Sequence, residues 1–566
     1  MIFSRKNHCL FILIIGLLLL NYSKSPAQAP YVQMSHPVYS FIDRMEVKHF
    51  MPFALTATRP LSRLDVARLL VSVYDSSNQG KNLNKTERRQ LEFFHFIFKE
   101  EIEREHKVAI KHEPLIQKIK QNKFVARIFP RVLYKNNRNF FSWQSDQVNI
   151  FFDPVYRYKT THTHLDTASQ KEKTNHFTNG FQIWGYLNNY LSFWVDVRDN
   201  KEWGTKTYQM GNYTLPGLGF VRSTSPDFIY HDETQAYIKL GFKNLQLIYG
   251  KFDNFWGNGR TGGLILSDQA TSYDQFKLEY KHKIFKFTSI YAQLIDYHFQ
   301  TEDLLQQKKY MAAHRLEAAP WNWLNLGLSE TVIFKSRSFE PAYLNPVMFF
   351  RSAEHYLGSP DNMMMGMDFK VTAIRNLKIY GELLIDDITT TKLGTNWYGN
   401  KHGLLGGIYW AEPVWINNLD FAVEYVRIRP FTYTHEESIQ HTHYGTGMGH
   451  WVGPNSDLLQ FSFIYQPSMR LRLEGSFRSI RKGGNSTYKN FGGDIDQHWE
   501  IGDGFYPKFL DGEHLTRSVY GINISYELFN SLFFRFDLIY ENNNVDSVLS
   551  ENFSATTLTA SVGINY

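Results

Sequence analysis

The chain has 566 residues, and its 61 Lys and Arg against 55 Asp and Glu give a formal net charge of +6. A balance this close to neutral excludes the strongly basic proteins that bind nucleic acid. Aromatic residues make up 16% of the chain, a share typical of proteins with aromatic girdles at a membrane interface. After residue 29 no run of 18 apolar residues occurs, which excludes transmembrane helices.

The amino terminus has the features of a secretory signal peptide, which we place at residues 1–29. The dipeptide Arg5-Lys6 precedes an apolar run over 10–20, and Ala27-Gln28-Ala29 offers a cleavage site of small residues. Its removal would take away the single cysteine, Cys9. We therefore expect an exported protein that uses neither disulfide nor thiol chemistry.

Residues 30–115 are predicted to form a small α-helical domain. Apolar residues recur at helical spacing over 37–45 and 60–70. Asn84 is a plausible N-cap, with Glu87 three residues later, for a helix that reaches about residue 106. Because this domain precedes the first predicted strand, we expect it on the periplasmic side of a membrane.

From residue 146 to the end the period changes to two, which predicts an all-β transmembrane barrel of antiparallel strands. Apolar and charged residues alternate, for example over 377–386 and 532–541. Charged side chains on one face are costly against lipid but acceptable in a lumen. Residues 116–145 are predicted to form either a connector or a segment inside the lumen. A soluble β-sandwich or propeller is the alternative, and it explains the signal peptide less well.

The connections between strands alternate strictly between short and long. The short ones are 188–189, 243–244, 282–283, 321–322, 375–376, 413–417, 467–468 and 529–530. The long ones are 159–176, 199–232, 254–273, 297–311, 336–363, 388–402, 430–457, 480–516 and 542–555. Outer-membrane barrels have short periplasmic turns and long extracellular loops. Nine long and eight short connections predict 18 strands, and 16 would also fit.

The last predicted strand, Thr557–Tyr566, alternates strictly and closes on an aromatic residue. This pattern is typical of the final strand of a bacterial outer-membrane barrel, which implies outer-membrane lipid and the barrel-insertion machinery as partners. To leave no open edge, the strand must pair with the first strand, near 147–158. Because 16–18 strands enclose a wide channel, we expect inward loops and the helical domain to block the lumen.

Two loop motifs carry a resemblance to a known family. The first is Trp256-Gly257-Asn258-Gly259-Arg260, followed by an L-x-L-S segment, and the second is Tyr343-Leu344-Asn345-Pro346. Together with the barrel they resemble the Wzi-type capsule assembly proteins of the outer membrane. The continuation over 351–362 is similar to the Bacteroidetes branch, which includes RemB-like gliding motility proteins. Gln269 departs from the Asn expected in the first motif.

The resemblance implies an 18-stranded barrel with a periplasmic helical bundle and no catalysis. It implies that the protein assembles or attaches capsule or exopolysaccharide at the surface, as a lectin-like or scaffold protein. The alternative is an outer-membrane component of a gliding or adhesion apparatus. These functions would make surface polysaccharide, and capsule-export or gliding proteins, its partners. An outer-membrane transporter is the third hypothesis, and it lacks a recognisable energy-coupling segment.

Sugar rings present apolar C–H faces that stack on aromatic rings, and their hydroxyl groups need polar partners. The motifs and one later loop supply such side chains, and these are the candidate polysaccharide-binding residues: Trp256, Arg260, Tyr343, Asn345, Arg351, Glu354 and Trp451. A purely structural role is the alternative for each residue: tight packing at Trp256, a turn at Asn345, and an ion pair between Arg351 and Glu354.

The sequence gives little support for a metal, a cofactor or an active site. His435, His441 and His443 could bind a metal ion, but histidine is also common in loops and no cysteine accompanies them. The glycines at 445–449 lack the strand-to-helix setting of a nucleotide-binding loop. Neither a G-x-S-x-G nor an H-E-x-x-H motif occurs. We therefore predict no cofactor, no metal and no enzyme activity.

Overall fold

The computed structural model describes residues 29–105, 107, 109–114, 117, 133–166, 170–205, 222–225, 228–296, 307–358, 361–436, 438–529, 531–546 and 552–565. The predicted signal peptide, apart from Ala29, and the terminal Tyr566 lie outside the described residues. None of the helices in the described ranges is long and apolar enough to cross a membrane.

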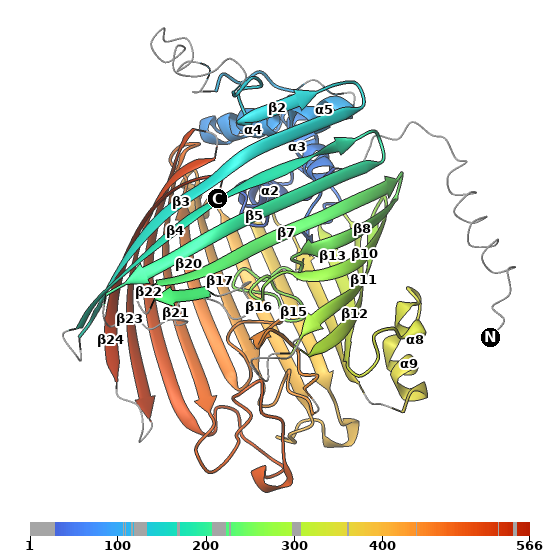
Figure 1. Ribbon diagram of the computed structural model, residues 1–566, viewed down its shortest axis with the longest axis vertical. Helices are drawn as coiled ribbons and strands as arrows, with labels where there is room; N and C mark the ends of the chain where they lie inside the picture. The colour runs from blue at the N-terminus through green and yellow to red at the C-terminus, as the bar shows by residue number, and fades with distance from the viewer. Residues whose placement is uncertain are drawn as a thin grey trace, which may run out of the picture.

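The chain forms a closed antiparallel barrel of 18 strands, which confirms the predicted fold class and strand number (Figure 1). The first nine strands are β3 Val148–Leu165, β4 Gln170–Leu187, β5 Leu191–Gly204, β7 Phe228–Phe242, β8 Leu245–Phe252, β10 Tyr273–His282, β11 Phe285–Ile295, β12 Lys308–Trp321 and β13 Leu324–Phe334. The others are β14 Asn362–Val371, β15 Leu377–Asp387, β16 Lys401–Ala411, β17 Leu419–Ile428, β20 Ser456–Tyr465, β21 Leu471–Gly484, β22 Glu513–Phe529, β23 Leu532–Asp546 and β24 Phe553–Ile564. Short strands β2 (Phe141–Gln144) and β6 (Arg222–Ser225) pair with β3 and β7.

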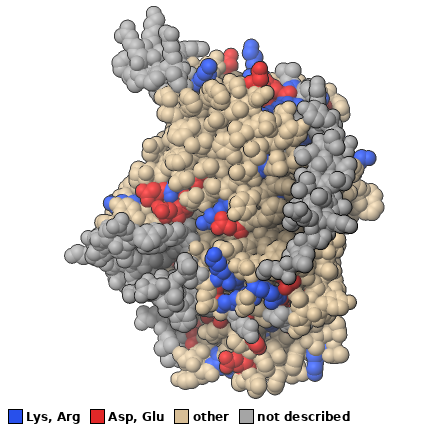
Figure 2. Space-filling view, turned by 45° about the vertical axis from the view of Figure 1, so that its right-hand side comes forward, with Lys and Arg blue, Asp and Glu red and all other residues tan. Residues whose placement is uncertain are grey.

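The two faces of the wall differ as the alternation predicts. On β15, Lys378 is 3% exposed and points into the lumen, whereas the next residue, Ile379, is 43% exposed on the outside. Apolar side chains such as Leu328 and Phe534 cover the outer face in the same way. Figure 2 shows a broad part of the wall without charged side chains, which gather at the top rim and lower down. The outer face is therefore suited to lipid.

The barrel closes between β24 and β3, as predicted, but in a different register. Residues 555–564 pair with Tyr156–Leu165, and the beginning of β3 pairs with β2 instead. Strands in a closed barrel are tilted and staggered. The last strand therefore pairs with the later part of β3 rather than with its beginning. The loop predicted at 159–176 was wrong, because β3 continues to Leu165 and β4 begins at Gln170.

Within the described residues, four helices lie at the end of the barrel that carries the short turns: α2 Val38–Val47, α3 Arg63–Asn78, α4 Lys85–Ile97 and α5 Lys99–Arg104. The predicted cap is confirmed, because the Asn84 side chain and Glu87 form a capping box at the start of α4. The helix predicted to reach residue 106 is broken at Phe98. Apolar residues of α2, α3 and α4 share one buried core.

Residues 29–105, here called the plug, enter the lumen rather than only covering its mouth. Arg44 of α2 binds Glu412, which follows β16, with its Nη2 atom 2.7 Å from Oε1. Glu46 is 2.7 Å from the Nζ atom of Lys370 on β14, and Asp65 is 2.6 Å from that of Lys281 on β10. These ion pairs tie the plug to one arc of the wall, from β10 to the turn after β16.

Candidate functional site

The first predicted motif lies inside the barrel and contacts the plug. Residues 253–272, here called the first inward loop, follow β8 and contain the short strand β9 (Phe255–Trp256). This strand pairs with β1 (Thr58–Arg59) of the plug. The Trp256 side chain is fully buried, and its backbone N–H donates to the Leu266 carbonyl at 3.0 Å. The indole ring of Trp256 therefore packs against protein on all sides.

A carboxylate of the wall holds the same loop in place. Glu382 of β15 accepts backbone N–H groups from Asn258 at 2.7 Å, Gly259 at 2.8 Å and Leu264 at 2.9 Å. Gly257 has a φ of 119°, and a Cβ atom there would lie 2.2 Å from Oε1 of Glu382. Only glycine fits this position, since the φ is left-handed and the carboxylate leaves no room. The W-G-x-G-R motif thus anchors the loop.

Arg260 ends the motif and faces the plug. Its backbone N–H and that of Thr261 donate to Glu424 of β17 at 2.7 and 2.8 Å. The guanidinium lies 4.8 Å from the ring centroid of Tyr409 and 3.9 Å from an Oδ2 atom of Asp43 on α2. One cation–π contact and one ionic contact thus hold the Arg260 side chain within the protein.

A second inward loop, residues 429–455, carries the histidines singled out from the sequence. His441 lies 2.7 Å from the Ile265 carbonyl, and His443 accepts the Ile295 backbone N–H at 3.1 Å. Burial lowers the pKa of His441 to about 4 and those of His443 and His450 to about 3. These histidines are therefore neutral packing residues at neutral pH. His435 is half-buried, and its Nδ1 atom lies 3.2 Å from the Glu436 carbonyl.

Trp451 stands next to His450 and links the two inward loops. Its Nε1 atom donates to the Thr261 carbonyl at 2.7 Å, and the side chain remains 40% exposed. The structure thus brings Trp256, Arg260 and Trp451 together in one assembly of inward loops. Trp256 is fully buried in this assembly, whereas part of the Trp451 ring remains exposed to solvent.

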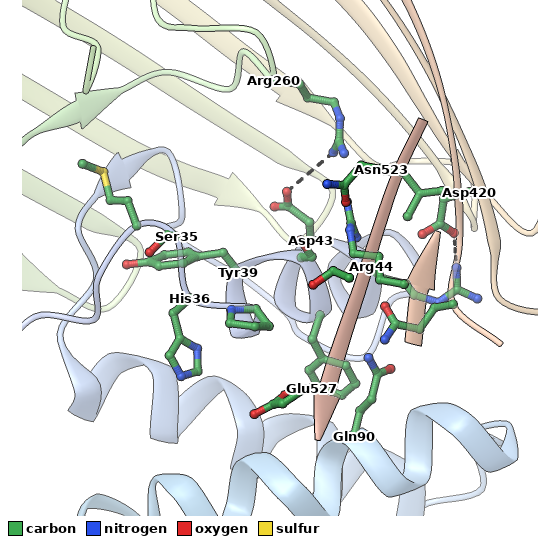
Figure 3. Close-up of a pocket in the computed structure, with 18 of the residues that line it drawn as sticks. Ser35, His36, Tyr39, Asp43, Arg44, Gln90, Arg260, Asp420, Asn523 and Glu527 are labelled. Atoms are coloured by element: carbon green, nitrogen blue, oxygen red, sulfur yellow. Dashed lines mark hydrogen bonds and ion pairs between the residues drawn. The ribbon is translucent and has the colours of Figure 1, made fainter. Parts of the chain in front are cut away.

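A polar cavity of about 600 Å³ separates the plug from the wall (Figure 3). Its lining includes Asp43 and Arg44 of α2, Arg260 of the first inward loop and Asp420 of β17. Burial raises the pKa of Asp43, but Lys378, Arg59 and Arg260 outweigh it and lower the pKa to about 2. The charged groups that Figure 3 labels in this cavity largely pair with one another, Arg44 with Asp420 and Arg260 with Asp43. These pairs hold α2 of the plug against β17 and the first inward loop.

The second motif lies elsewhere, on the outer face of the wall. Helices α8 (Pro341–Leu344) and α9 (Phe350–Tyr356) stand beside the barrel in Figure 1. They pack on Ala312 of β12 and Val332 of β13, whose side chains point outward. Tyr343 is buried there, and its hydroxyl donates to Asp361 at 2.7 Å.

The remaining candidates flank Tyr343 on these two helices. Asn345 accepts the Val347 backbone N–H at 3.2 Å, which sets the turn between α8 and α9. Arg351 is 3.6 Å from Glu354, whose side chain is buried against the wall, while Arg351 is largely exposed. The two motifs, and the residues predicted from them, therefore do not form one site.

A partly exposed cluster of aromatic side chains lies on two long loops, outside the motifs and candidate residues predicted from the sequence. We call it the aromatic platform, and it consists of Trp397 and Tyr398 between β15 and β16, with Trp499, Phe505 and Tyr506 between β21 and β22. The Trp397 and Phe505 rings stack with an interplanar angle of 4°, and Tyr398 stacks on Trp499 at 3.8 Å. Phe505 is 45% and Tyr506 51% exposed.

The platform is held by backbone contacts and bordered by polar groups. The Tyr398 backbone N–H donates to the Phe505 carbonyl at 3.0 Å, and Trp499 Nε1 donates to the Gly504 carbonyl at 2.8 Å. Lys392 lies 5.5 Å from the Trp397 ring centroid. Flat aromatic rings beside polar side chains suit a sugar ring, whose faces are apolar and whose edge is polar. The clustering of Trp and Tyr in predicted extracellular loops was the signal that could have revealed it.

The apolar outer wall, the plug in the lumen and the asymmetric loops define an outer-membrane β-barrel protein. Over residues 158–502, more than half of the chain, the sequence matches the family described as capsule assembly protein Wzi. The chain belongs to this family, as its motifs suggested.

Among solved structures, the chain is similar to Wzi of Escherichia coli, an outer-membrane protein involved in group 1 capsule assembly and described as a carbohydrate-binding β-barrel. The TM-score is 0.52 at 14% identity, and the match covers 95% of this chain and 99% of that one. OccK8 (OprE) of Pseudomonas aeruginosa matches with a TM-score of 0.42 at 10% identity, over 73% of this chain and 98% of that one. OccAB2 of Acinetobacter baumannii matches with a TM-score of 0.42 at 12% identity, over 72% and 97%. No curated protein matches the sequence.

Proposed function

We propose that this protein is a non-catalytic outer-membrane barrel that attaches or assembles surface polysaccharide. The observation that carries the proposal is the aromatic platform on the long loops, where Phe505 and Tyr506 are exposed and Trp397, Tyr398 and Trp499 are half-buried beside them. Membership of the Wzi family and the carbohydrate binding described for the Escherichia coli protein support the same function.

The platform is the primary glycan contact in this proposal. Of the residues proposed from the motifs, Asn345, Arg351 and Trp451 have exposed side chains and remain candidates for secondary contacts. Trp256, Arg260, Tyr343 and Glu354 are assigned an anchoring role, because each is enclosed by or paired with protein groups. The absence of catalysis is part of the proposal, since binding by stacking requires no reacting side chain.

A cell-based experiment tests this function. Strains that carry Trp397→Ala together with Trp499→Ala should make capsule at normal amounts but shed it into the medium, as a deletion strain would. Trp415→Ala is the matched control, because Trp415 is 92% exposed at the opposite, short-turn end of the barrel. If the deletion strain retains its polysaccharide as the wild type does, the proposal is wrong.

A role in gliding or adhesion is the second candidate. It is favoured by the resemblance to RemB-like proteins over 351–362, because α9 carries residues 351–356 of this segment on the outer wall and exposes Tyr356 by 91%. Such a surface suits a neighbouring protein of the apparatus better than it suits a glycan in solution. Loss of spreading in a Tyr356→Ala strain that keeps its capsule would favour this function over polysaccharide attachment.

A further inference from the structure

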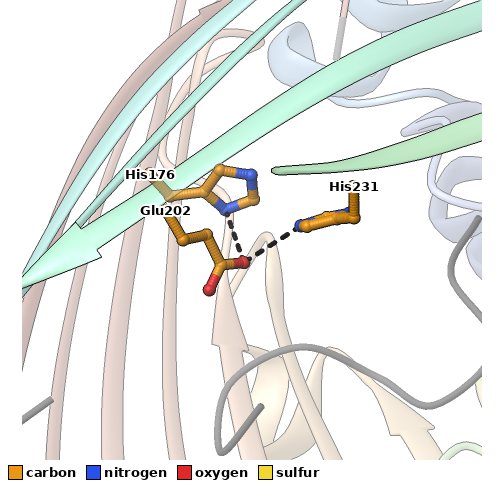
Figure 4. A group of neighbouring side chains, drawn as sticks. All are labelled: His176, Glu202 and His231. Atoms are coloured by element: carbon orange, nitrogen blue, oxygen red, sulfur yellow. Dashed lines mark hydrogen bonds and ion pairs between the residues drawn. The ribbon is translucent and has the colours of Figure 1, made fainter. Parts of the chain in front are cut away.

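We propose that His176, Glu202 and His231 form a binding site for a zinc ion on the lumen face of the barrel. The three residues lie on the neighbouring strands β4, β5 and β7, and all three are buried (Figure 4). They are distant from the aromatic platform in the sequence and belong to none of the motifs. Because the ligands come from three strands, their spacing along the chain gave no signal.

The distances between the potential ligand atoms suit one small ion. The Nε2 atom of His231 is 3.2 Å and the Nδ1 atom of His176 is 3.7 Å from the same Oε1 atom of Glu202. All three ligand atoms lie within 4.8 Å of one another. Ligands at about 2.0–2.1 Å from a tetrahedral zinc ion are separated by roughly 3.3 Å, close to what is observed.

Neighbouring groups fix the orientation of His176 for metal binding. Its Nε2 atom lies 2.9 Å from Oδ1 of Asn200, an acceptor on β5, and the Thr178 hydroxyl donates to the same oxygen at 2.7 Å. Because Oδ1 can only accept, Nε2 carries the proton and Nδ1 presents its lone pair toward Glu202. A second-shell hydrogen bond of this kind is a regular feature of histidines that bind metals.

His231 supplies the second, independent observation. It is 1% exposed, and among the described residues its Nδ1 atom has no hydrogen-bond partner, while Nε2 points at Glu202. With Nε2 bound to an ion, the proton would reside on Nδ1, and a buried imidazole would gain a strong bond in place of one 3.2 Å contact. Two imidazoles and one carboxylate are the ligand set of open zinc sites and a poor set for calcium, which takes oxygen ligands.

Arg157 of β3 is the group that competes with the ion. Its Nη2 atom is 3.1 Å from Nδ1 of His176, where it occupies the lone pair that zinc requires. The guanidinium must therefore move aside on binding, and the like charge lowers the affinity. Once bound, the ion would add a coordinate link to the hydrogen bonds that Asn200 of β5 makes to His176 of β4 and Glu233 of β7, and so stabilise this part of the wall.

The test uses the full-length protein in detergent micelles, stripped of metal with EDTA and titrated with zinc chloride. We expect one zinc per chain by elemental analysis and a rise in unfolding temperature with zinc. His231→Gln and Glu202→Gln should each weaken binding at least tenfold, and Arg157→Ala should strengthen it. His162→Gln is the control, because His162 is an exposed histidine on the outer face of β3 and should bind zinc as the wild type does.

X-ray absorption at the zinc edge of the wild-type protein keeps the test independent of whether the variants fold. Two nitrogen ligands and at least one oxygen ligand at about 2.0–2.1 Å would support the site. The proposal is overturned if the wild type binds no zinc at micromolar concentrations, or if binding is unchanged in a folded His231→Gln variant.

Discussion

Glu382 accepts three backbone N–H groups of the first inward loop, and Glu424 accepts two more. At the scale of single residues, these two wall carboxylates hold the segment Trp256-Gly257-Asn258-Gly259-Arg260 of this chain in place. Glycine at 257 makes room for Glu382, and Arg260 continues the contact to the plug. In this chain the segment thus determines the course of the first inward loop through the lumen.

Replacing Glu382 with Ala should destabilise the barrel, because three buried N–H groups lose their acceptor. The expected loss is about 3 kcal/mol or more in the free energy of unfolding, measured by urea titration in lipid vesicles. Glu474→Ala is the control, since Glu474 is a partly exposed lumen residue paired with Arg472 and should change stability by about 1 kcal/mol at most. Equal stability of the Glu382 and Glu474 variants would contradict the anchoring role.

The second inward loop should respond to pH through its buried histidines. In the folded protein the pKa values of His441, His443 and His450 lie at about 4, 3 and 3, below the ordinary 6.5. The folded state therefore prefers the neutral rings, so stability is complete above pH 6.5 and falls as the pH drops toward 4. Limited proteolysis should cut residues 429–455 faster at pH 4.5 than at pH 7.5. A His441→Gln variant should show a weaker response, and a loop insensitive to pH would exclude this contribution.

At the scale of elements, the helices of the plug depend on charges buried between them and the wall. Arg44 contacts Glu87 within the plug and both Glu412 and Asp420 of the barrel. Removing one member of such a buried network leaves the others without compensation. The plug is therefore expected to dock as one unit.

Arg44→Ala should release the plug from the wall. The expected cost is about 3–5 kcal/mol, because three carboxylates lose a buried partner. Hydrogen exchange of α2 would measure the release. Arg68→Ala is the control, because the Arg68 side chain is 45% exposed and forms a surface ion pair with Glu105. This variant should leave hydrogen exchange in α2 unchanged. Identical exchange in both variants would show that docking does not depend on this network.

The elements differ in how far the sequence could predict them. The alternation of polar and apolar residues, as at Lys378 and Ile379, predicted the strands and the face toward lipid. Asn84 and Glu87 predicted the start of α4. These are local patterns, and local chemistry decides them. The inward course of the loop around Trp256 depends on Glu382, more than a hundred residues later, and no pattern near Trp256 records it. The outer position of α9 likewise depends on contacts with β12 and β13.

The aromatic platform was missed for the same reason. Trp397 and Phe505 are adjacent only because two long loops meet above the wall. The motif residues attracted attention instead, and most of them anchor the loops. A family resemblance indicates where the architecture requires a residue, which need not be where a ligand binds.

At the scale of the whole molecule, the plug and the two inward loops fill the lumen of an 18-strand barrel, whose unfilled interior would be a wide channel. In planar bilayers the wild-type protein should show no conductance at porin levels. A variant that lacks residues 38–104 should conduct, because the buried helices α2 to α5 are removed. Porin-like conductance of the intact protein would contradict the occluded lumen and favour a transporter.

The most direct test of polysaccharide attachment is the binding of capsular polysaccharide from the same strain to the purified protein, measured by surface plasmon resonance. The account predicts that replacing both Trp397 and Trp499 with Ala weakens binding at least tenfold, about 1.4 kcal/mol, while Trp415→Ala binds as the wild type does. Unchanged affinity of a folded Trp397 and Trp499 double variant would contradict the assignment of the aromatic platform as the glycan contact.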